Sequence, residues 1–310
     1  MTSPAADRAD LPPPRLEEIG DGTWAYVQLD GSWGLNNAGV LAGSEGVTLV
    51  DTCFTERRTR DLVAAVDGIG RGPVKTLVNT HHHGDHTHGN WLVPGATVVG
   101  HERCREEVLA SGRISEAVFP GVDWGEVQVR APFVTFTDRL TVWADDLRAD
   151  LEFVGPAHTT NDVVVWLPDR RTLFAGDLVF AGGTPFVVMG SVAGALAALD
   201  RLAVLGAETV VPGHGPVSGP DVIADQQAYL RFVTDLAERA DAAGVGPLEA
   251  AREADLGAFA GWHDPERLVG NLHRALAERH GVEPGGAIDV AAAFADMVAY
   301  NGGRPLRCLA

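Results

Sequence analysis

The chain is poor in cysteine. Its 310 residues include only Cys53, Cys104 and Cys308, which are odd in number, widely separated and without a CxxC pair. This pattern argues against a disulfide framework. Because structural disulfides are typical of oxidising compartments, the pattern predicts a reducing, cytoplasmic location.

Basic residues and long apolar runs are scarce as well. The chain has 24 lysine and arginine residues against 42 aspartate and glutamate residues, a net charge of −18, which argues against nucleic acid and anionic membranes as partners. No apolar run is long enough to cross a bilayer. Residues 1–18 are polar and proline-rich, without the basic and apolar regions of a secretory signal, and are expected to form a disordered lead-in.

Histidine, by contrast, is concentrated in one place. Five of the 11 histidines lie between Asn79 and His88, in the run NTHHHGDHTH. Residues 74–78, just before this run, are apolar and β-branched and predict a buried strand. The cluster is therefore expected where a strand ends, which is where open α/β sheets build their binding sites.

The spacing within the cluster indicates a metal site. His81 and His83 alternate with His82, so in an extended turn they point to one side. Asp85 and His86 follow a glycine that lets the chain bend back toward the same point. Converging imidazoles and a carboxylate are typical of a transition-metal site, with zinc as the favoured ion. The alternatives are a solvated polar loop or a cloning tag, although a tag would be terminal and uninterrupted.

Hydrophobic periodicity divides the chain into a mixed core and a helical end. Strands and helices are expected in two comparable halves over residues 19–220, and helices alone over residues 221–310. No linker precedes the helical extension, so we expect it to pack on the core. Residues 111–130 are irregular and contain aromatic side chains, which predicts either a lid near the pocket mouth or an ordinary surface loop.

Four further candidate ligands come shortly after predicted strands. They are Asp51, His158, Asp177 and His214. Any one of them alone is more often a cap or a turn residue. Together with the histidine cluster they place metal-compatible side chains at five strand ends, and this joint pattern is the strongest signal in the sequence.

The combination resembles the metallo-β-lactamase superfamily, whose fingerprint is HxHxDH followed by isolated His, Asp and His. The strand end LVDT at residues 49–52 and the turn PGHG at 212–215 also match, and the likeness covers residues 20–219. It implies an α+β fold, a four-layer αβ/βα sandwich with the metals between its two sheets and a C-terminal helical extension.

The resemblance also implies a ligand set. The first metal would be bound by His81, His83 and His158. The second would be bound by Asp85, His86 and His214, and Asp177 would bridge the two. Two zinc ions are expected, with iron or manganese as alternatives, and a metal-bound hydroxide would attack the substrate carbonyl. Asp85 and Asp51 are the catalytic candidates, the latter by orienting a ligand histidine. His82 and His88 match no ligand position.

The branches of this family differ in their ligands. Asp177 stands where the secreted β-lactamases carry cysteine, and His83 where flavodiiron oxygen reductases carry glutamate. The complete set is that of glyoxalase II-like thioesterases and lactonases. Residues 123–126, 184–194 and 266–274 also look like actinomycete homologues, among them the second-ring aromatic polyketide cyclase/thioesterases of antibiotic biosynthesis.

We therefore expect a hydrolase acting on an ester or thioester of a small-molecule or acyl-carrier-bound substrate. The alternatives are a persulfide dioxygenase with one iron on His81, His158 and Asp177, and a non-catalytic scaffold. A homodimer is compatible with the sequence. The candidates for a wide apolar pocket are equally consistent with ordinary core, and they are Trp33, Trp91, Phe119, Trp124, Phe186 and Met189.

Overall fold

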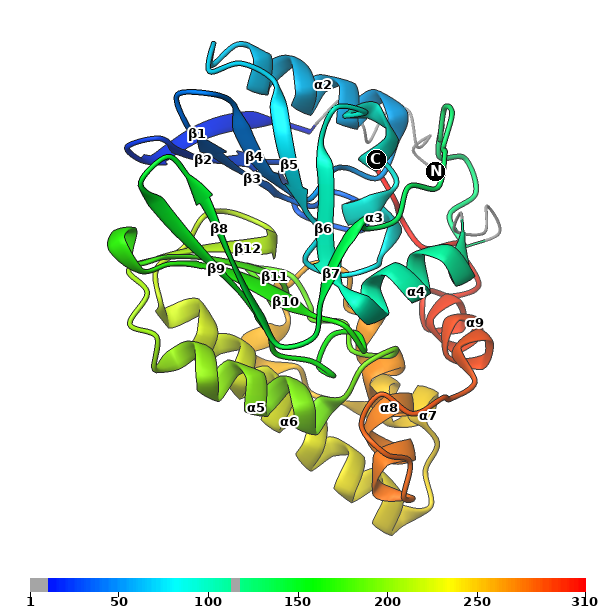
Figure 1. Cartoon of the computed structure of the whole chain (residues 1–310). Helices are drawn as coiled ribbons and strands as arrows, with labels where there is room; N and C mark the ends of the chain where they lie inside the picture. Colours follow the sequence, from blue (N-terminus) through cyan, green and yellow to red (C-terminus); the bar gives the residue numbers. More distant parts are fainter. Residues whose placement is uncertain (1–10, 113–117) are drawn as a thin grey trace.

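The computed structural model describes residues 11–112 and 118–310, which contain two β-sheets lying face to face (Figure 1). The first sheet has seven strands in chain order, antiparallel from β1 to β4 and parallel from β4 to β7. Its strands are β1 (Arg15–Gly20), β2 (Thr23–Val27), β3 (Ala38–Ala42), β4 (Val47–Val50), β5 (Val74–Val78), β6 (Thr97–His101) and β7 (Val134–Phe136).

The second sheet has five strands in the order β12-β11-β10-β9-β8. All of its neighbours are antiparallel except β11 and β12, which are parallel. The strands are β8 (Arg139–Ala144), β9 (Leu147–Phe153), β10 (Val163–Leu167), β11 (Thr172–Phe180) and β12 (Thr209–His214). Strands β10 and β11 are buried along their whole length, which agrees with the continuous apolar sequence of β10 and with a β11 that is apolar apart from Thr172, Gly176 and Asp177.

Helices cover the outer faces of both sheets. Leu62 of α2 (Glu56–Asp67) packs with the outer side chains of the first sheet, and α4 (Glu102–Ser111) lies beside β6 and β7. On the second sheet, α5 (Val192–Ala203) and α6 (Asp221–Ala243) pack against β11. Apolar side chains such as Val78 and Leu151 fill the space between the sheets. These layers confirm the predicted αβ/βα sandwich.

The C-terminal extension packs on this sandwich, as Figure 1 shows for the orange and red helices. It contains α6, α7 (Pro247–Glu253), α8 (Arg267–Arg279) and α9 (Val290–Tyr300). Leu268, Leu272 and Met297 are fully buried in the same apolar cluster as the outer face of the second sheet. The short elements of the chain are α3 (Gly84–Thr87), η1 (Asn90–Leu92), η2 (Pro168–Arg170) and η3 (Gly257–Phe259).

The N-terminal boundary differs from the expected one. The lead-in was expected to run through residue 18, but β1 begins at Arg15 and pairs with β2. Leu16 packs on the α2 side of the sheet and Ile19 packs toward the other sheet. The two glutamates between Leu16 and Ile19 interrupt the alternation of apolar and polar residues that is typical of a strand. The sequence therefore looks polar and does not predict β1. Residues 1–10 of the expected lead-in lie outside the described residues.

The expected lid falls partly outside the described residues, at positions 113–117. The rest of it, residues 118–130, is held firmly. Phe119 and Trp124 are buried, and the Arg130 guanidinium donates to four main-chain carbonyls between residues 90 and 96. Glu126 N donates to the carboxylate of Glu56 in α2 over 2.7 Å. Residues 118–130 are therefore packed against the core and hydrogen-bonded to it.

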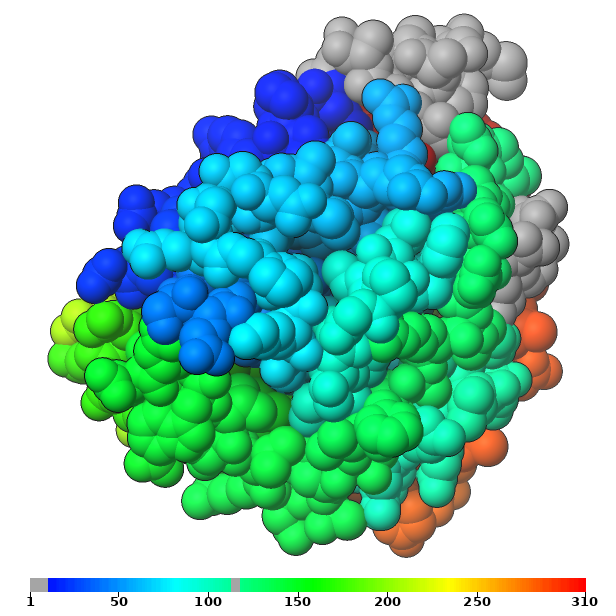
Figure 2. Space-filling view, turned by 45° about the horizontal axis from the view of Figure 1, so that its top comes forward, coloured from blue at the N-terminus to red at the C-terminus, as the bar shows by residue number. Residues whose placement is uncertain are grey.

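The space-filling view in Figure 2 shows that the blue-to-cyan first third and the green middle of the chain cover one face, whereas the orange C-terminal helices reach only its edge. No helix within residues 11–112 and 118–310 has the length and apolar character needed to cross a membrane.

Candidate metal centre

The loops and strand ends at one edge of the two sheets bring all seven predicted ligands together. They form two groups whose ligand atoms lie within 4.8 Å of one another, and Asp177 belongs to both groups. Asp177 was expected after its strand but lies inside β11, where the register with β12 shifts. His214, also expected after its strand, is the last residue of β12.

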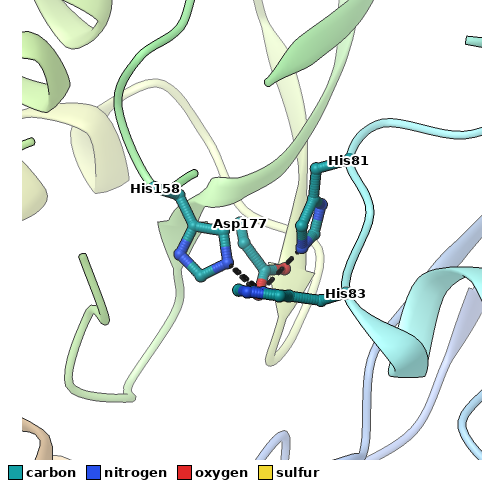
Figure 3. A group of neighbouring side chains, drawn as sticks. All are labelled: His81, His83, His158 and Asp177. Carbon is teal, nitrogen blue, oxygen red and sulfur yellow. Dashed lines mark hydrogen bonds and ion pairs between the residues drawn. The ribbon is translucent and has the colours of Figure 1, made fainter. Parts of the chain in front are cut away.

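The first group consists of three imidazoles and one carboxylate, which face a common point in Figure 3. His158 Nε2 is 2.8 Å from His83 Nδ1 and 3.3 Å from Asp177 Oδ2. His81 Nε2 is 3.9 Å from the same carboxylate oxygen. His81 and His158 are buried, so the group lies beneath the surface.

The second group contacts both oxygens of the Asp177 carboxylate. His86 Nε2 is 3.0 Å from Asp177 Oδ1, and His214 Nε2 is 3.4 Å from Asp177 Oδ2. Asp85 Oδ2 lies 3.3 Å from His214 Nε2 and 3.9 Å from His86 Nε2. Asp177 is thus placed to bridge the two groups.

Asp51 fixes the orientation of two ligand histidines. Its backbone is in the left-handed region at φ +62°, and its carboxylate accepts from Thr80 N and Thr80 Oγ1 over 2.8 and 2.7 Å. The same carboxylate is 2.8 Å from His86 Nδ1. Because Thr80 Oγ1 donates to Asp51, it accepts from His81 Nδ1, 3.0 Å away. Both rings therefore carry a proton on the outer nitrogen and direct Nε2 inward.

Main-chain carbonyls orient two further rings in the same way. His158 Nδ1 donates to Phe186 O, and His214 Nδ1 donates to Gly31 O over 3.1 Å. Carbonyl oxygens only accept, so each ring carries a proton on Nδ1 and directs Nε2 to the centre. Four histidines are thus held with Nε2 inward, the orientation that a metal ligand requires.

The inner atoms of the centre have the chemistry that divalent cations require. His81 Nε2, His86 Nε2 and Asp177 Oδ1 are buried and have no hydrogen-bond partner in the described part of the chain. An unsatisfied buried polar atom costs about 1–3 kcal/mol, which a bound cation would offset. Imidazole and carboxylate ligands suit zinc, iron or manganese, and the two groups fit a dinuclear site.

Burial and the carboxylates set opposite charge states in the two groups. Burial lowers the pKa of His81 and His83 well below the usual value, which keeps both rings neutral. Burial also opposes the charge on His214, but Asp177 and Asp85 outweigh it and raise the pKa of His214 to about 9. The second group thus attracts positive charge strongly.

Two histidines of the cluster stay outside both groups. His82 Nδ1 accepts from Asn161 Nδ2 over 2.9 Å, and burial lowers its pKa to about 4. His88 stacks on Phe54 with ring centroids 5.5 Å apart. Their positions agree with the expectation that neither is a ligand.

A small cavity of about 60 Å³ lies over the centre and reaches Asp85, Asp177 and His214. It adjoins a groove of about 870 Å³ along α9, with which it shares Met189 and Phe294. The described lining of that groove contains no lysine, arginine, aspartate or glutamate.

The predicted pocket residues are divided by the structure. Those that line the cavity are Trp33, Phe119, Phe186 and Met189. Trp91 and Trp124 are absent from the described lining of both the cavity and the groove. Apart from two glycines, sequence reasoning missed four lining residues, which are Phe54, Phe180, Arg267 and Phe294. Phe180 was detectable as the apolar continuation of the Asp177 strand, whereas the helical residues carried no local signal.

Comparison with known proteins agrees with this geometry. The metallo-beta-lactamase type 2 of Bacteroides fragilis is 27% identical over 217 residues, which are 67% of this chain and 82% of that protein. The hydroxyacylglutathione hydrolase of Methylococcus capsulatus is 33% identical over 162 residues, 48% of this chain and 55% of that protein.

A solved metallo-beta-lactamase from Pontibacter korlensis superimposes with a TM-score of 0.61 at 24% identity, covering 71% of this chain and 99% of that one, which shows the shared fold. Residues 31–214, more than half of the chain, match the sequence pattern of the Metallo-beta-lactamase superfamily. The matched segment spans both groups of the centre, and we conclude that the chain belongs to the metallo-β-lactamase superfamily.

Proposed function

We propose that this chain is a dinuclear-metal hydrolase that cleaves an ester or thioester at its carbonyl carbon, with zinc as the expected metal. One observation carries the proposal: two ligand groups share Asp177, and three of their inner atoms, His81 Nε2, His86 Nε2 and Asp177 Oδ1, are buried without hydrogen-bond partners in the described chain. The hydroxyacylglutathione hydrolase that the chain resembles is a thioesterase by its name.

Divalent cations in such a centre lower the pKa of water and polarise a carbonyl group. The residues of the chain position and balance that chemistry. Asp177 holds the two groups together. Asp51 keeps the proton of His86 on its outer nitrogen by a direct contact, and that of His81 through Thr80. Asp85 lines the cavity and is the carboxylate placed to accept the proton of the attacking water.

The apolar groove supports a substrate with a bulky acyl group. Its described lining has no charged carboxylate or cationic side chain, although it includes histidines such as His82. An acylglutathione carries two carboxylates and an ammonium, which this surface does not complement. We therefore propose an aromatic or polycyclic acyl thioester, as for the polyketide cyclase/thioesterases that the sequence resembles, over a glutathione thioester or a small lactone.

The first experiment is elemental analysis of protein purified without added metal or chelator. We expect about two zinc ions per chain, and chelation should abolish hydrolysis of aryl-acyl thioesters. Asp177→Ala should lose metal and activity together. A metal-replete, active Asp177→Ala protein would overturn the proposal. A single iron per chain, with oxygen uptake on glutathione persulfide, would also overturn it and would indicate a persulfide dioxygenase.

Hydrolysis of matched thioesters of one thiol tests the substrate class. A bulky aryl-acyl thioester should be cleaved with a higher kcat/KM than an acetyl thioester, because only the former fills the groove. The opposite preference, or a preference for S-lactoylglutathione over both, would favour the glyoxalase II-like alternative.

A further inference from the structure

One cation lies in the wall of the cavity. Arg267 is the first residue of α8, its side chain is only 1% exposed, and it lines the same cavity as Asp177 and His214. Its guanidinium carbon lies 3.9 Å from the centre of the Trp33 ring and 5.0 Å from that of Phe180. The aromatic contacts hold the planar group in one orientation.

The hydrogen bonds of this guanidinium are incomplete. Arg267 Nη1 donates to Thr184 O over 3.0 Å, and Nη2 pairs with Asp264 Oδ2 at 2.9 Å. The remaining group, Nε, is buried and has no partner among residues 11–112 and 118–310. A buried donor without an acceptor is costly, and such a group at a binding site indicates a missing ligand atom.

Arg274 provides the comparison. It lies on the same helix and is also only 1% exposed, but each of its three guanidinium nitrogens donates a hydrogen bond. Nε and Nη2 donate to Val188 O over 3.0 and 2.7 Å, and Nη1 donates to Gly286 O over 2.8 Å. The free donor is therefore a property of the arginine in the cavity wall, and not of buried arginines in this helix.

The charges around Arg267 select the kind of acceptor. Asp264 already neutralises the guanidinium, and a second buried carboxylate, Glu266, accepts from Trp33 Nε1 over 2.8 Å. One cation thus stands beside two carboxylates, so an anionic substrate group would meet repulsion there. An uncharged oxygen acceptor takes the free N–H without that penalty.

We propose that Arg267 Nε recognises an uncharged oxygen, a ketone or a hydroxyl, on the aromatic acyl group of the substrate. The identification of the ligand as a substrate rests on the proposed function. Arg267 is then a specificity-determining residue from the C-terminal extension, and the apolar rings beside it receive the carbon skeleton that carries the oxygen.

Calorimetric titration with non-hydrolysable ligands tests this. The probes are thioethers of N-acetylcysteamine with a 2-, 3- or 4-acetylbenzyl group, each paired with its ethylbenzyl counterpart, in which a methylene replaces the ketone. For wild type we expect at least one acetyl ligand to bind about tenfold more tightly than its partner. In Arg267→Met that ratio should fall to about one, whereas Arg274→Met should retain it.

Each ratio is measured within one protein preparation, so a reduced folded fraction does not change it. Since Arg267→Met leaves Asp264 buried without its cation, the double variant Arg267→Met/Asp264→Asn is measured as well, and asparagine suits the φ of +54° at position 264. The inference is overturned if the wild-type ratio is about one for all three pairs, if no ligand binds, or if both Arg267 variants keep the preference.

The hydrolysis assay separates the two claims. A ketone preference that depends on Arg267, in a protein with no metal-dependent hydrolysis, supports the recognition site and overturns the proposed function. Metal-dependent hydrolysis with no ketone preference supports the proposed function and overturns the recognition site.

Discussion

Asp51→Asn tests how far metal binding depends on the carboxylate beneath the histidines. The substitution is conservative at φ +62°, because asparagine tolerates this backbone conformation. The amide oxygen can still accept from Thr80 N. Its NH₂ group, however, then faces Thr80 Oγ1 and His86 Nδ1, both of which act as donors in the wild-type arrangement.

His86 therefore loses the acceptor of its outer nitrogen, because an NH₂ group cannot accept from His86 Nδ1. If the amide also donates to Thr80 Oγ1, that hydroxyl must turn its own proton away from residue 51. Losing a hydrogen bond to a charged group costs about 1.5–3 kcal/mol in unfolding free energy. Disrupting such support for a ligand typically weakens metal affinity by about 10–100-fold.

Competition with a chromogenic zinc chelator measures that loss. The control is Asp145→Asn, since Asp145 also has a positive φ, of 52°, and accepts from Ser44 Oγ over 3.0 Å in an exposed turn. We expect wild-type affinity for both metals in the control and weaker binding in Asp51→Asn. If Asp51→Asn retains both metals with wild-type affinity, the orientation argument is wrong.

Variants of one ligand, one glycine and one buried carboxylate test the rest of the site. Asp85→Asn should keep about one metal per chain, because Asp85 belongs only to the second group; two retained metals by elemental analysis would contradict this assignment. Gly213→Ala should lose metal from both groups, because a Cβ would overlap Asp177 Oδ1, whereas Gly219→Ala, where a Cβ would meet no atom within 4 Å, should keep the wild-type content. Burial raises the pKa of Asp264 to about 6, so its contribution to stability is full below the unfolded pKa of 3.8 and is lost as pH rises through 6. In urea titrations of the metal-free chain, the unfolding free energy of wild type minus that of Asp264→Asn should fall by about 2 kcal/mol between pH 4 and pH 7.5; an unchanged difference would refute the burial argument.

The ligand positions were predictable because each follows from a local pattern. His81 and His83 come just after an apolar strand, and the fold brings the ends of β4, β5, β9 and β12 to one edge. Asp177 was predicted to follow its strand but lies inside it, because Gly176 and the register shift make a continuous strand look as if it ends early. That the seven residues bind metal stays a prediction until it is measured.

The cavity wall was less predictable because it depends on contacts between distant parts of the chain. Arg267 and Phe294 come from helices far along the sequence, and nothing in the residues around them indicates the metal centre. An arginine at the start of a helix looks solvent-exposed by pattern. Its burial follows from Trp33 and Asp264, which meet it only in the folded chain.

The C-terminal helices supply Arg267 and Phe294 to the cavity wall, and α9 lies along the groove, whereas the candidate ligands all lie within residues 81–214. Part of the binding surface is thus encoded outside the stretch of sequence that encodes the ligands. Mutations in α8 and α9 can reshape that part of the surface without replacing a ligand. Exchanging those helices between homologues would be a direct route to new substrate ranges, and natural divergence in this part of the chain can proceed while the chemistry is conserved.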